Sequence, residues 1–208
     1  MTRSKAVFGV VLAGGASRRF GRPKARAEID GSSLAERSVG TLQSAGLPVG
    51  MVTADEDLAK SLGVPSRRDI EAGLGPLGGL WTALEWAEER RETAVFLLGC
   101  DMPLVTSDLV RLVMDRSGPA VAAAPMGPGG VQPLCALYTL ACLPEVRKIA
   151  LSEDRSLHGL LSAVEAVEIG EGEVGSVSDP ATVFWNVNTE ADGVRAAELL
   201  SSTLGGGR

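Results

Sequence analysis

A glycine-rich segment with several basic residues begins at Leu12, directly after an apolar run, and ends at Lys24. Gly14 and Gly15 lack a Cβ, so their backbone can approach a ligand closely, and consecutive N–H groups there can bind an anion. Arg19 and Lys24 add positive charge to the same segment. These residue types predict a site for the phosphates of a nucleotide. A surface loop of solvated basic side chains is the alternative.

The segment matches neither of two common phosphate-binding motifs. A P-loop has the pattern G-x-x-x-x-G-K-[ST], whereas here Arg22 and Pro23 separate Gly21 from Lys24. The G-x-G-x-x-G pattern of dinucleotide-binding folds is absent as well. The phosphate site would therefore belong to another class of nucleotide-binding protein.

An aspartate directly follows a second apolar run. Asp101 lies in the sequence LGCDMP, after the predicted strand Ala94 to Leu98. A carboxylate at the carboxyl end of a buried strand faces the crevice in which α/β folds bind ligands. Magnesium is bound through few carboxylates together with water and substrate phosphates, which makes Asp101 a candidate ligand for Mg²⁺. A turn role before Pro103 is the alternative.

Asp69 is a further candidate on the nucleotide side. It precedes the glycine-rich stretch 73–79, which opens a predicted helix, and a helix N-terminus favours anions. A plain connection between a strand and a helix is the alternative reading. The only histidine, His158, has no histidine or cysteine motif nearby, and we expect a packing or surface role for it.

Several polar residues in the last third could contact a second substrate. Asn186 and Asn188 are two positions apart on a predicted strand, 183–187 and its end, so their side chains would face the same side. The alternative is a capping role for Asn188 or Thr189 before the last helix. Gln132 and Arg155 are candidates for the same acceptor site, with a strand start and a helix start as their alternatives.

The elements that must position these residues alternate along the chain. Predicted strands are 6–12, 49–53, 67–70, 94–98, 120–124, 133–138, 164–169 and 183–187. Predicted helices are 33–45, 55–62, 77–90, 106–116, a stretch ending at 149, 156–162 and 191–204. This alternation predicts a mostly parallel sheet with helices on both faces. The sequence MGPGG at 126–130 is expected to form a tight mobile loop.

Length and composition favour a single domain. The chain has 208 residues, of which 45% are hydrophobic and 22% charged, which is typical of a globular fold. We expect residues 1–125 to form a nucleotide-binding half, residues 126–204 to shape the acceptor site, and residues 205–208 to be a flexible tail.

Charge and cysteine content exclude several classes of protein. A net charge of −6 argues against nucleic-acid binding, and the lack of an 18-residue apolar run argues against a membrane span. The three cysteines form no C-x-x-C pair, which predicts free thiols in a reducing cytoplasm instead of a zinc site or a disulfide scaffold.

In this order, the motifs resemble those of the molybdenum cofactor guanylyltransferases, the MobA-type family, over nearly the whole chain. The matching elements are L-A-G-G-x-S-x-R-[MF]-G-x-x-K from Leu12, G-P-L-x-G-[IL] from Gly75, C-D-x-P from Cys100, P-L-x-A-L-Y from Pro133, D-R-S-L from Asp154 and F-x-N-[IV]-N-T from Phe184. The first element is shared by many nucleotidyltransferases, whereas the ordered set is specific.

The resemblance implies a three-layer α/β/α fold of the nucleotide-diphospho-sugar transferase type, with a mostly parallel, Rossmann-like sheet. It implies transfer of GMP from GTP to molybdopterin with Mg²⁺, and molybdenum-insertion proteins and molybdoenzyme chaperones as protein partners. The positions implied to bind nucleotide are Leu12, Ala13, Gly14, Gly15, Lys24, Asp69 and Asp101. Arg19, Lys24 and Asp101 would be catalytic, with Arg19 at the leaving pyrophosphate and Asp101 on the metal. Asn186 and Asn188 would line the acceptor and metal side.

The chain departs from the family pattern at two places. Pro23 stands where the family often has aspartate, and a related group that transfers CMP favours proline there but tends to carry L-A-A-G in place of L-A-G-G. The run from Thr53 to Asp55 stands where the family often has asparagine. Three alternatives therefore remain: a molybdopterin cytidylyltransferase, a sugar- or polyol-phosphate nucleotidyltransferase, and a non-catalytic nucleotide-binding protein.

Overall fold

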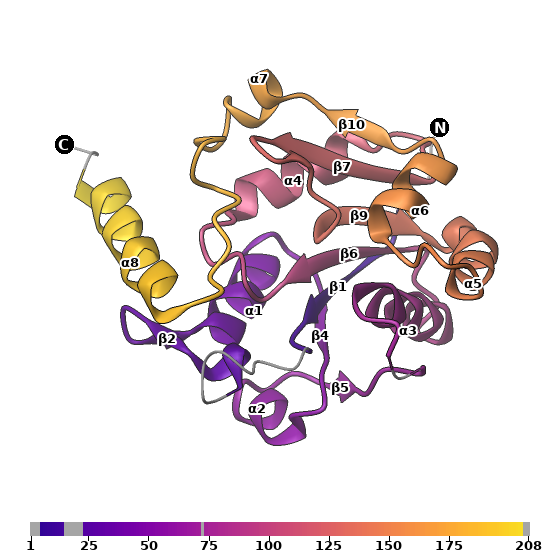
Figure 1. Cartoon of the computed structure of the whole chain (residues 1–208), viewed down its shortest axis with the longest axis horizontal. Coiled ribbons are helices and arrows are strands. Elements are labelled where there is room, and N and C mark those ends of the chain that lie inside the picture. Colours follow the sequence, from indigo (N-terminus) through magenta and orange to yellow (C-terminus); the bar gives the residue numbers. More distant parts are fainter. Residues whose placement is uncertain (1–4, 15–22, 72, 206–208) are drawn as a thin grey trace.

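A twisted central sheet runs through the computed structural model of the chain, which describes residues 5–14, 23–71 and 73–205 (Figure 1). Its strands lie in the order β10-β7-β9-β6-β1-β4-β5, and β8 pairs with β7 outside this row. The strands are β1 (Val7–Leu12), β4 (Val49–Val52), β5 (Ser66–Arg67), β6 (Ala94–Gly99), β7 (Ala122–Gly127), β8 (Gly130–Val131), β9 (Cys135–Thr139) and β10 (Val167–Ile169).

Most of this sheet is parallel, as the alternating pattern predicts. Strand β1 pairs in parallel with both β4 and β6, and β4 with β5 and β7 with β10 are parallel as well. Strand β9 runs antiparallel to β6 and β7. Only a few residues separate β9 from the β7–β8 hairpin, and a parallel return would need a crossover of a dozen or more residues. The reversal of β9 thus follows from its short connection.

Helices cover both faces of the sheet, because the strand residues alternate between two apolar cores. Along β1, Phe8 and Val10 face one core and Val11 faces the other. The first core includes side chains of α3 (Pro76–Glu89), α5 (Leu143–Ala150) and α6 (Leu157–Ala163). The second includes side chains of α1 (Leu34–Ser44), α2 (Glu56–Ser61), α4 (Ser107–Arg116) and α7 (Glu171–Val174).

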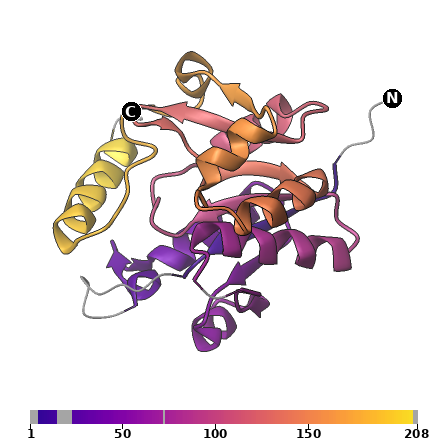
Figure 2. The same cartoon turned by 45° about the vertical axis from the view of Figure 1, so that its right-hand side comes forward.

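The last helix, α8 (Glu190–Gly205), lies to one side of these layers (Figure 1, Figure 2). It packs beside a small hairpin of β2 (Glu28–Ile29) and β3 (Ser32–Ser33), where Ile29, Val187 and Ala196 are buried together. Two short 3-10 helices, η1 (Lys24–Arg26) and η2 (Leu140–Cys142), complete the fold. Among the described residues, none of the helices combines the length and apolar character needed to cross a membrane.

Polar caps set the helix boundaries near the predicted positions. The Ser33 hydroxyl accepts a hydrogen bond from the N–H of Glu36, whose carboxylate accepts one from the N–H of Ser33, so α1 begins with a capping box. Asp55, Thr106 and Ser156 cap α2, α4 and α6 through single side-chain acceptors.

One predicted strand is wrong. Residues 183–187 form no strand, because the Asp179 carboxylate accepts hydrogen bonds from the Ala181 N–H and the Thr182 hydroxyl and so holds the chain in a turn. The MGPGG stretch forms a tight connection, as predicted: Met126 pairs with Val131 in the β7–β8 hairpin, with a two-residue turn at its tip.

Other differences are smaller. Strand β5 is shorter than the predicted strand 67–70. The hairpin of β2 and β3 was not predicted, although its turn residues Asp30 and Gly31 both have positive φ and form the D-G pair typical of such turns. Gly205, placed in the predicted tail, is the last residue of α8, and the rest of that tail lies outside the described residues. The three cysteines are buried and free, as expected.

Candidate active site

A cavity of about 230 Å³ opens at the carboxyl ends of the central parallel strands. It is lined by Leu12, Gly14, Lys24, Val52, Asp69, Gly75, Pro76, Gly79, Gly99, Cys100, Asp101 and Leu134. Strands β1, β4 and β6 are parallel, so their last residues meet at one edge of the sheet. Five residues predicted to bind nucleotide therefore share one cavity: Leu12, Gly14, Lys24, Asp69 and Asp101.

Lys24 joins two distant parts of the chain at the wall of this cavity. Its Nζ atom lies 3.1 Å from Asp101 Oδ2 and donates to Asn188 Oδ1 at 2.7 Å. Lys24 begins η1, Asp101 follows β6, and Asn188 precedes α8. The side chains of the ion pair are 19% and 24% exposed, so this charged contact is partly shielded from solvent. One cationic nitrogen thus contacts both a carboxylate and an amide oxygen.

The N-terminal end of α3 forms another part of the cavity wall. Gly75, Pro76 and Gly79 line the cavity there, and the backbone N–H groups of a helix N-terminus attract anions. Gly79 allows α3 to pack closely on the end of β1, since a Cβ at this position would lie 2.8 Å from Leu12 Cδ2. Asp69 lies in the connection before this helix, and burial raises the pKa of its carboxyl.

A second depression, of about 340 Å³, lies next to this cavity. It is lined by Pro128, Gly129, Gln132, Ala181, Phe184, Trp185, Asn186, Asn188 and Asp192. Three predicted acceptor residues, Gln132, Asn186 and Asn188, therefore meet here although 183–187 is not a strand. Asn188 also contacts Lys24 in the first cavity, so the two hollows share a boundary. This arrangement can hold two substrates side by side.

Other predicted residues are not brought to these cavities. Arg155 lines neither hollow, and its Nε donates to the carbonyl of Ser152 at 3.1 Å. Ala13 lines neither hollow but lies directly beside the first one, where its N–H donates to the carbonyl of Val52. Gly15 and Arg19 lie outside the described residues.

Asp192 is a site residue that sequence reasoning missed. Its carboxylate accepts hydrogen bonds from the N–H groups of Asn188 at 2.8 Å and Thr189 at 2.7 Å, while the Thr189 hydroxyl accepts from the Asp192 N–H. These hydrogen bonds lower the pKa of Asp192, and the bond from the Asn188 N–H makes the largest contribution. Thr189 and Asp192 form a capping box for α8. The spacing T-x-x-D was therefore the sequence signal that could have identified Asp192.

A metal ion at this site would need ligands from the substrate. Within the described ranges, no three acidic, histidine or cysteine side chains cluster closely enough to hold a metal. Asp101 and Asn188 offer one carboxylate and one amide oxygen around the Lys24 nitrogen. Such a sparse oxygen set suits Mg²⁺, which is bound in proteins with few carboxylates and completes its shell with water and phosphate oxygens.

The fold and the motifs have clear counterparts among known proteins. The family model "MobA-like NTP transferase domain" matches residues 9–168. A probable molybdenum cofactor guanylyltransferase of Opitutus terrae is 34% identical over 189 residues, which cover 88% of this chain and 90% of that protein. One from Pelotomaculum thermopropionicum is 29% identical over 198 residues, covering 95% of each chain.

Solved structures show the same architecture. Molybdopterin-guanine dinucleotide biosynthesis protein A from Archaeoglobus fulgidus superposes with a TM-score of 0.76 at 24% identity, covering 93% of this chain and 98% of that one. The 4-diphosphocytidyl-2C-methyl-D-erythritol synthase of Anaerococcus prevotii superposes with a TM-score of 0.73 at 11% identity, covering 95% and 97%. These likenesses confirm the predicted α/β/α fold.

Proposed function

The chain belongs to the family of MobA-like NTP transferase domains, and from this membership we propose that it transfers GMP from GTP to molybdopterin and releases pyrophosphate. One observation of the structure carries the proposal. Lys24, Asp101 and Asn188 meet where a cavity at the strand ends adjoins a second depression, so a nucleotide and an acceptor would lie next to each other.

The proposed reaction is an in-line displacement at phosphorus. A phosphate oxygen of molybdopterin attacks the α-phosphorus of GTP, and the bond from that phosphorus to the bridging oxygen of pyrophosphate breaks. Such transfers depend mainly on positioning and on stabilising negative charge. The attacking phosphate is already an anion, so no general base is required. Lys24 and the α3 N-terminus would supply positive potential around the phosphates.

Magnesium fits the oxygen atoms at the boundary of the two hollows. Asp101 Oδ2 and Asn188 Oδ1 both contact the Lys24 ammonium, which shows that a single cation can reach both of them. Bound Mg²⁺ would neutralise charge on the α-phosphate and on the departing pyrophosphate. Asp101 and Asn188 would hold and orient it, while Asp192 keeps Asn188 in place through its backbone N–H.

The same proposal includes the cellular setting. Three free cysteines suit the cytoplasm, where thiols stay reduced. Molybdenum-insertion proteins and molybdoenzyme chaperones are the protein partners that the reaction would require on either side.

Pyrophosphate release tests the proposal directly. The purified protein is mixed with molybdopterin and GTP, CTP, ATP or UTP, with Mg²⁺ or with a chelator. We expect release with GTP and Mg²⁺, its loss in Asp101→Asn, and weaker GTP binding in Lys24→Ala. Asp108→Asn is the matched control, because Asp108 is exposed and its ion pair is with Arg111 on the surface of α4.

Other outcomes of this assay would distinguish the alternative functions. Preference for CTP would make the enzyme a cytidylyltransferase, which the Pro23–Lys24 dipeptide favours. Release with a sugar or polyol phosphate but not with molybdopterin would assign another acceptor. Nucleotide binding with no release in any combination would contradict catalysis. Full release in the presence of the chelator would contradict the role of Mg²⁺.

A further inference from the structure

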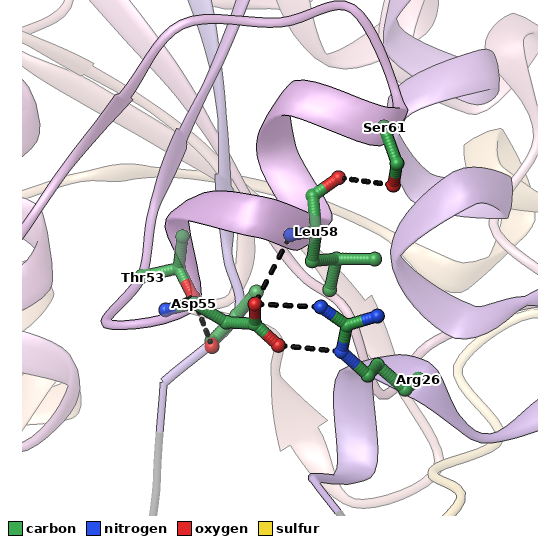
Figure 3. Close-up of polar contacts among 6 residues, drawn as sticks. Arg26, Thr53, Asp55, Leu58 and Ser61 are labelled. Atoms are coloured by element: carbon green, nitrogen blue, oxygen red, sulfur yellow. Dashed lines mark hydrogen bonds and ion pairs between the residues drawn. The ribbon is translucent and has the colours of Figure 1, made fainter.

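The turn after β4 holds two separate parts of the chain at once (Figure 3). The hydroxyl of Thr53 donates to the carbonyl of Ala13 at 3.1 Å and accepts a hydrogen bond from the N–H of Asp55 at 3.0 Å. The carboxylate of Asp55 accepts from Arg26 Nε at 2.6 Å and from Arg26 Nη2 at 2.7 Å. Ala13 lies at the start of the glycine-rich segment and Arg26 lies just after its end, so one turn is bonded to both ends of it.

The bond to Ala13 fixes the end of β1. Thr53 is only 3% exposed, and its hydroxyl is one of the few buried polar groups of the core. The Ala13 N–H donates to the carbonyl of Val52, so both backbone polar groups of Ala13 are bonded to residues at or just after the end of β4. These two bonds fix the direction in which the backbone leaves the sheet toward Gly14.

The bond to Arg26 fixes η1. A guanidinium that gives two parallel hydrogen bonds to one carboxylate sets orientation as well as distance. Arg26 is two residues after Lys24 in the same three-residue helix, and the residues on either side of Arg26, Ala25 and Ala27, are buried. The position of the Lys24 side chain between Asp101 and Asn188 therefore depends on where Asp55 holds this helix.

The Arg26 pair contributes more to position than to stability. The two side chains are 43% and 26% exposed, and ion pairs at such sites contribute little to the free energy of folding. Capping of α2 needs only Asp55 Oδ1, which accepts from the Leu58 N–H at 3.0 Å. The hydrogen bonds from Arg26 also lower the pKa of Asp55, so the carboxylate stays charged at neutral pH.

We propose that Thr53 and Asp55 are positioning residues of the nucleotide site, which hold Ala13 and Arg26 so that Gly14 and Lys24, near the two ends of the glycine-rich segment, face the phosphates. This role rests on the proposed nucleotidyl transfer. It predicts that removing either bond changes nucleotide binding and turnover without a matching loss of fold.

Asp55→Asn is the first variant to make. Asparagine is as good a helix cap as aspartate, so α2 keeps its N-terminal bond while the charged bidentate pair with Arg26 is lost. We expect about tenfold weaker GTP binding, measured with a fluorescent GTP analogue, and a thermal midpoint close to that of the wild type. Arg26→Ala should give a similar loss, and the double variant should lose no more than either single one.

Three further variants separate positioning from general damage. Thr53→Val removes the hydroxyl at nearly constant volume, whereas Thr53→Ser keeps it, so only valine should weaken GTP binding. Glu89→Gln is the matched control: it breaks another bidentate pair, with Arg67, at the far end of α3 from the cavity. Its GTP affinity should equal that of the wild type.

Amide hydrogen exchange gives a readout that needs no nucleotide. In Asp55→Asn the N–H groups of Arg26 and Ala27, which bond within η1, should exchange faster while those of β1 and β6 do not change. Unchanged exchange in η1 together with unchanged GTP affinity would overturn the proposal, as would additive losses in the double variant. If the wild type bound no GTP, the proposed function would fail, and the exchange rates alone would still decide whether Asp55 holds η1.

Discussion

A single methyl group at Gly99 should displace the carboxylate of Asp101 without removing it. Gly99 ends β6, and a Cβ built at this position would lie 2.7 Å from Asp101 Oδ1. Carbon and oxygen atoms in contact are normally separated by roughly 3.3 Å, so the oxygen would have to move by roughly 0.6 Å. The backbone need not change, because the residue lies in regular strand geometry.

The displacement has a predictable cost in rate. Catalytic groups must lie within roughly 0.5 Å of their productive position, and a shift of about 1 Å can lower a rate about a hundredfold. We therefore expect Gly99→Ala to lower kcat/KM roughly tenfold or more, which corresponds to at least about 1.4 kcal/mol of transition-state stabilisation. The Lys24 contact to Asp101 Oδ2 should weaken as well, since both oxygens belong to one rigid group.

The assay is pyrophosphate release with GTP varied from below to above its KM, and urea unfolding is measured in parallel. Gly40→Ala is the control, because a Cβ there would meet no atom within 4 Å and the residue lies inside α1. That variant should keep full activity and gain roughly 0.5–1 kcal/mol of stability. Wild-type kcat/KM in a folded Gly99→Ala protein would refute the reasoning that Asp101 must be held in one place.

Three further predictions concern stability and reactivity. Gly50→Ala should destabilise the fold by roughly 1–3 kcal/mol in urea unfolding, because its Cβ would lie 2.6 Å from Trp86 Cη2. Burial raises the pKa of the Cys135 thiol to about 12, so at pH 8 a thiol reagent should react with Cys135 only as fast as the protein opens. The pKa of Asp192 is lowered in the fold, so its contribution to stability is present above the unfolded pKa of about 4 and disappears as pH falls through the folded value. The difference in unfolding free energy between the wild type and Asp192→Asn should accordingly shrink between pH 6 and pH 3; a constant difference would contradict it.

The parts of the fold that the sequence predicts are those in which a local pattern and the tertiary environment agree. The runs that became β1 and β6 are continuously apolar because helices cover both of their faces. The cap at Ser33 marks the start of α1 through a hydrogen bond three residues away, and the proline that opens α3 marks that start through its fixed φ. Such signals need no knowledge of the rest of the chain.

Tertiary contacts decide the parts that the sequence does not predict. The apolar residues of 183–187 have the composition of a strand, but the side chain of Asp179 turns the chain before it can join the sheet. The pair of Arg26 with Asp55 joins residues 29 positions apart, and the choice of partner depends on how β1 and β4 lie side by side.

The candidate site likewise contains residues that the sequence places well and one that it does not. Lys24 was predicted from its charge in the glycine-rich segment, and Asp101 from its place at the end of a buried strand; the ends of β1 and β6 meet at one edge of a parallel sheet. Arg155 was placed at the acceptor side because of its neighbouring motif, but it lies on the α5–α6 connection away from both hollows. Motif order along the chain does not fix distance between loops, and only the packing of α5 and α6 determines where that connection lies.

The strand order also has a consequence for synthesis on the ribosome. The neighbouring strands β5, β4, β1 and β6 all come from the first 99 residues, whereas Asn188 is contributed by the segment before the last helix. Protein chains are made from the N-terminus, and early parts can fold before later ones emerge. A nascent chain can thus build the strand ends that carry the nucleotide long before the acceptor side exists. The nucleotide and the acceptor can therefore be bound side by side only after the C-terminal segment with Asn188 has been added.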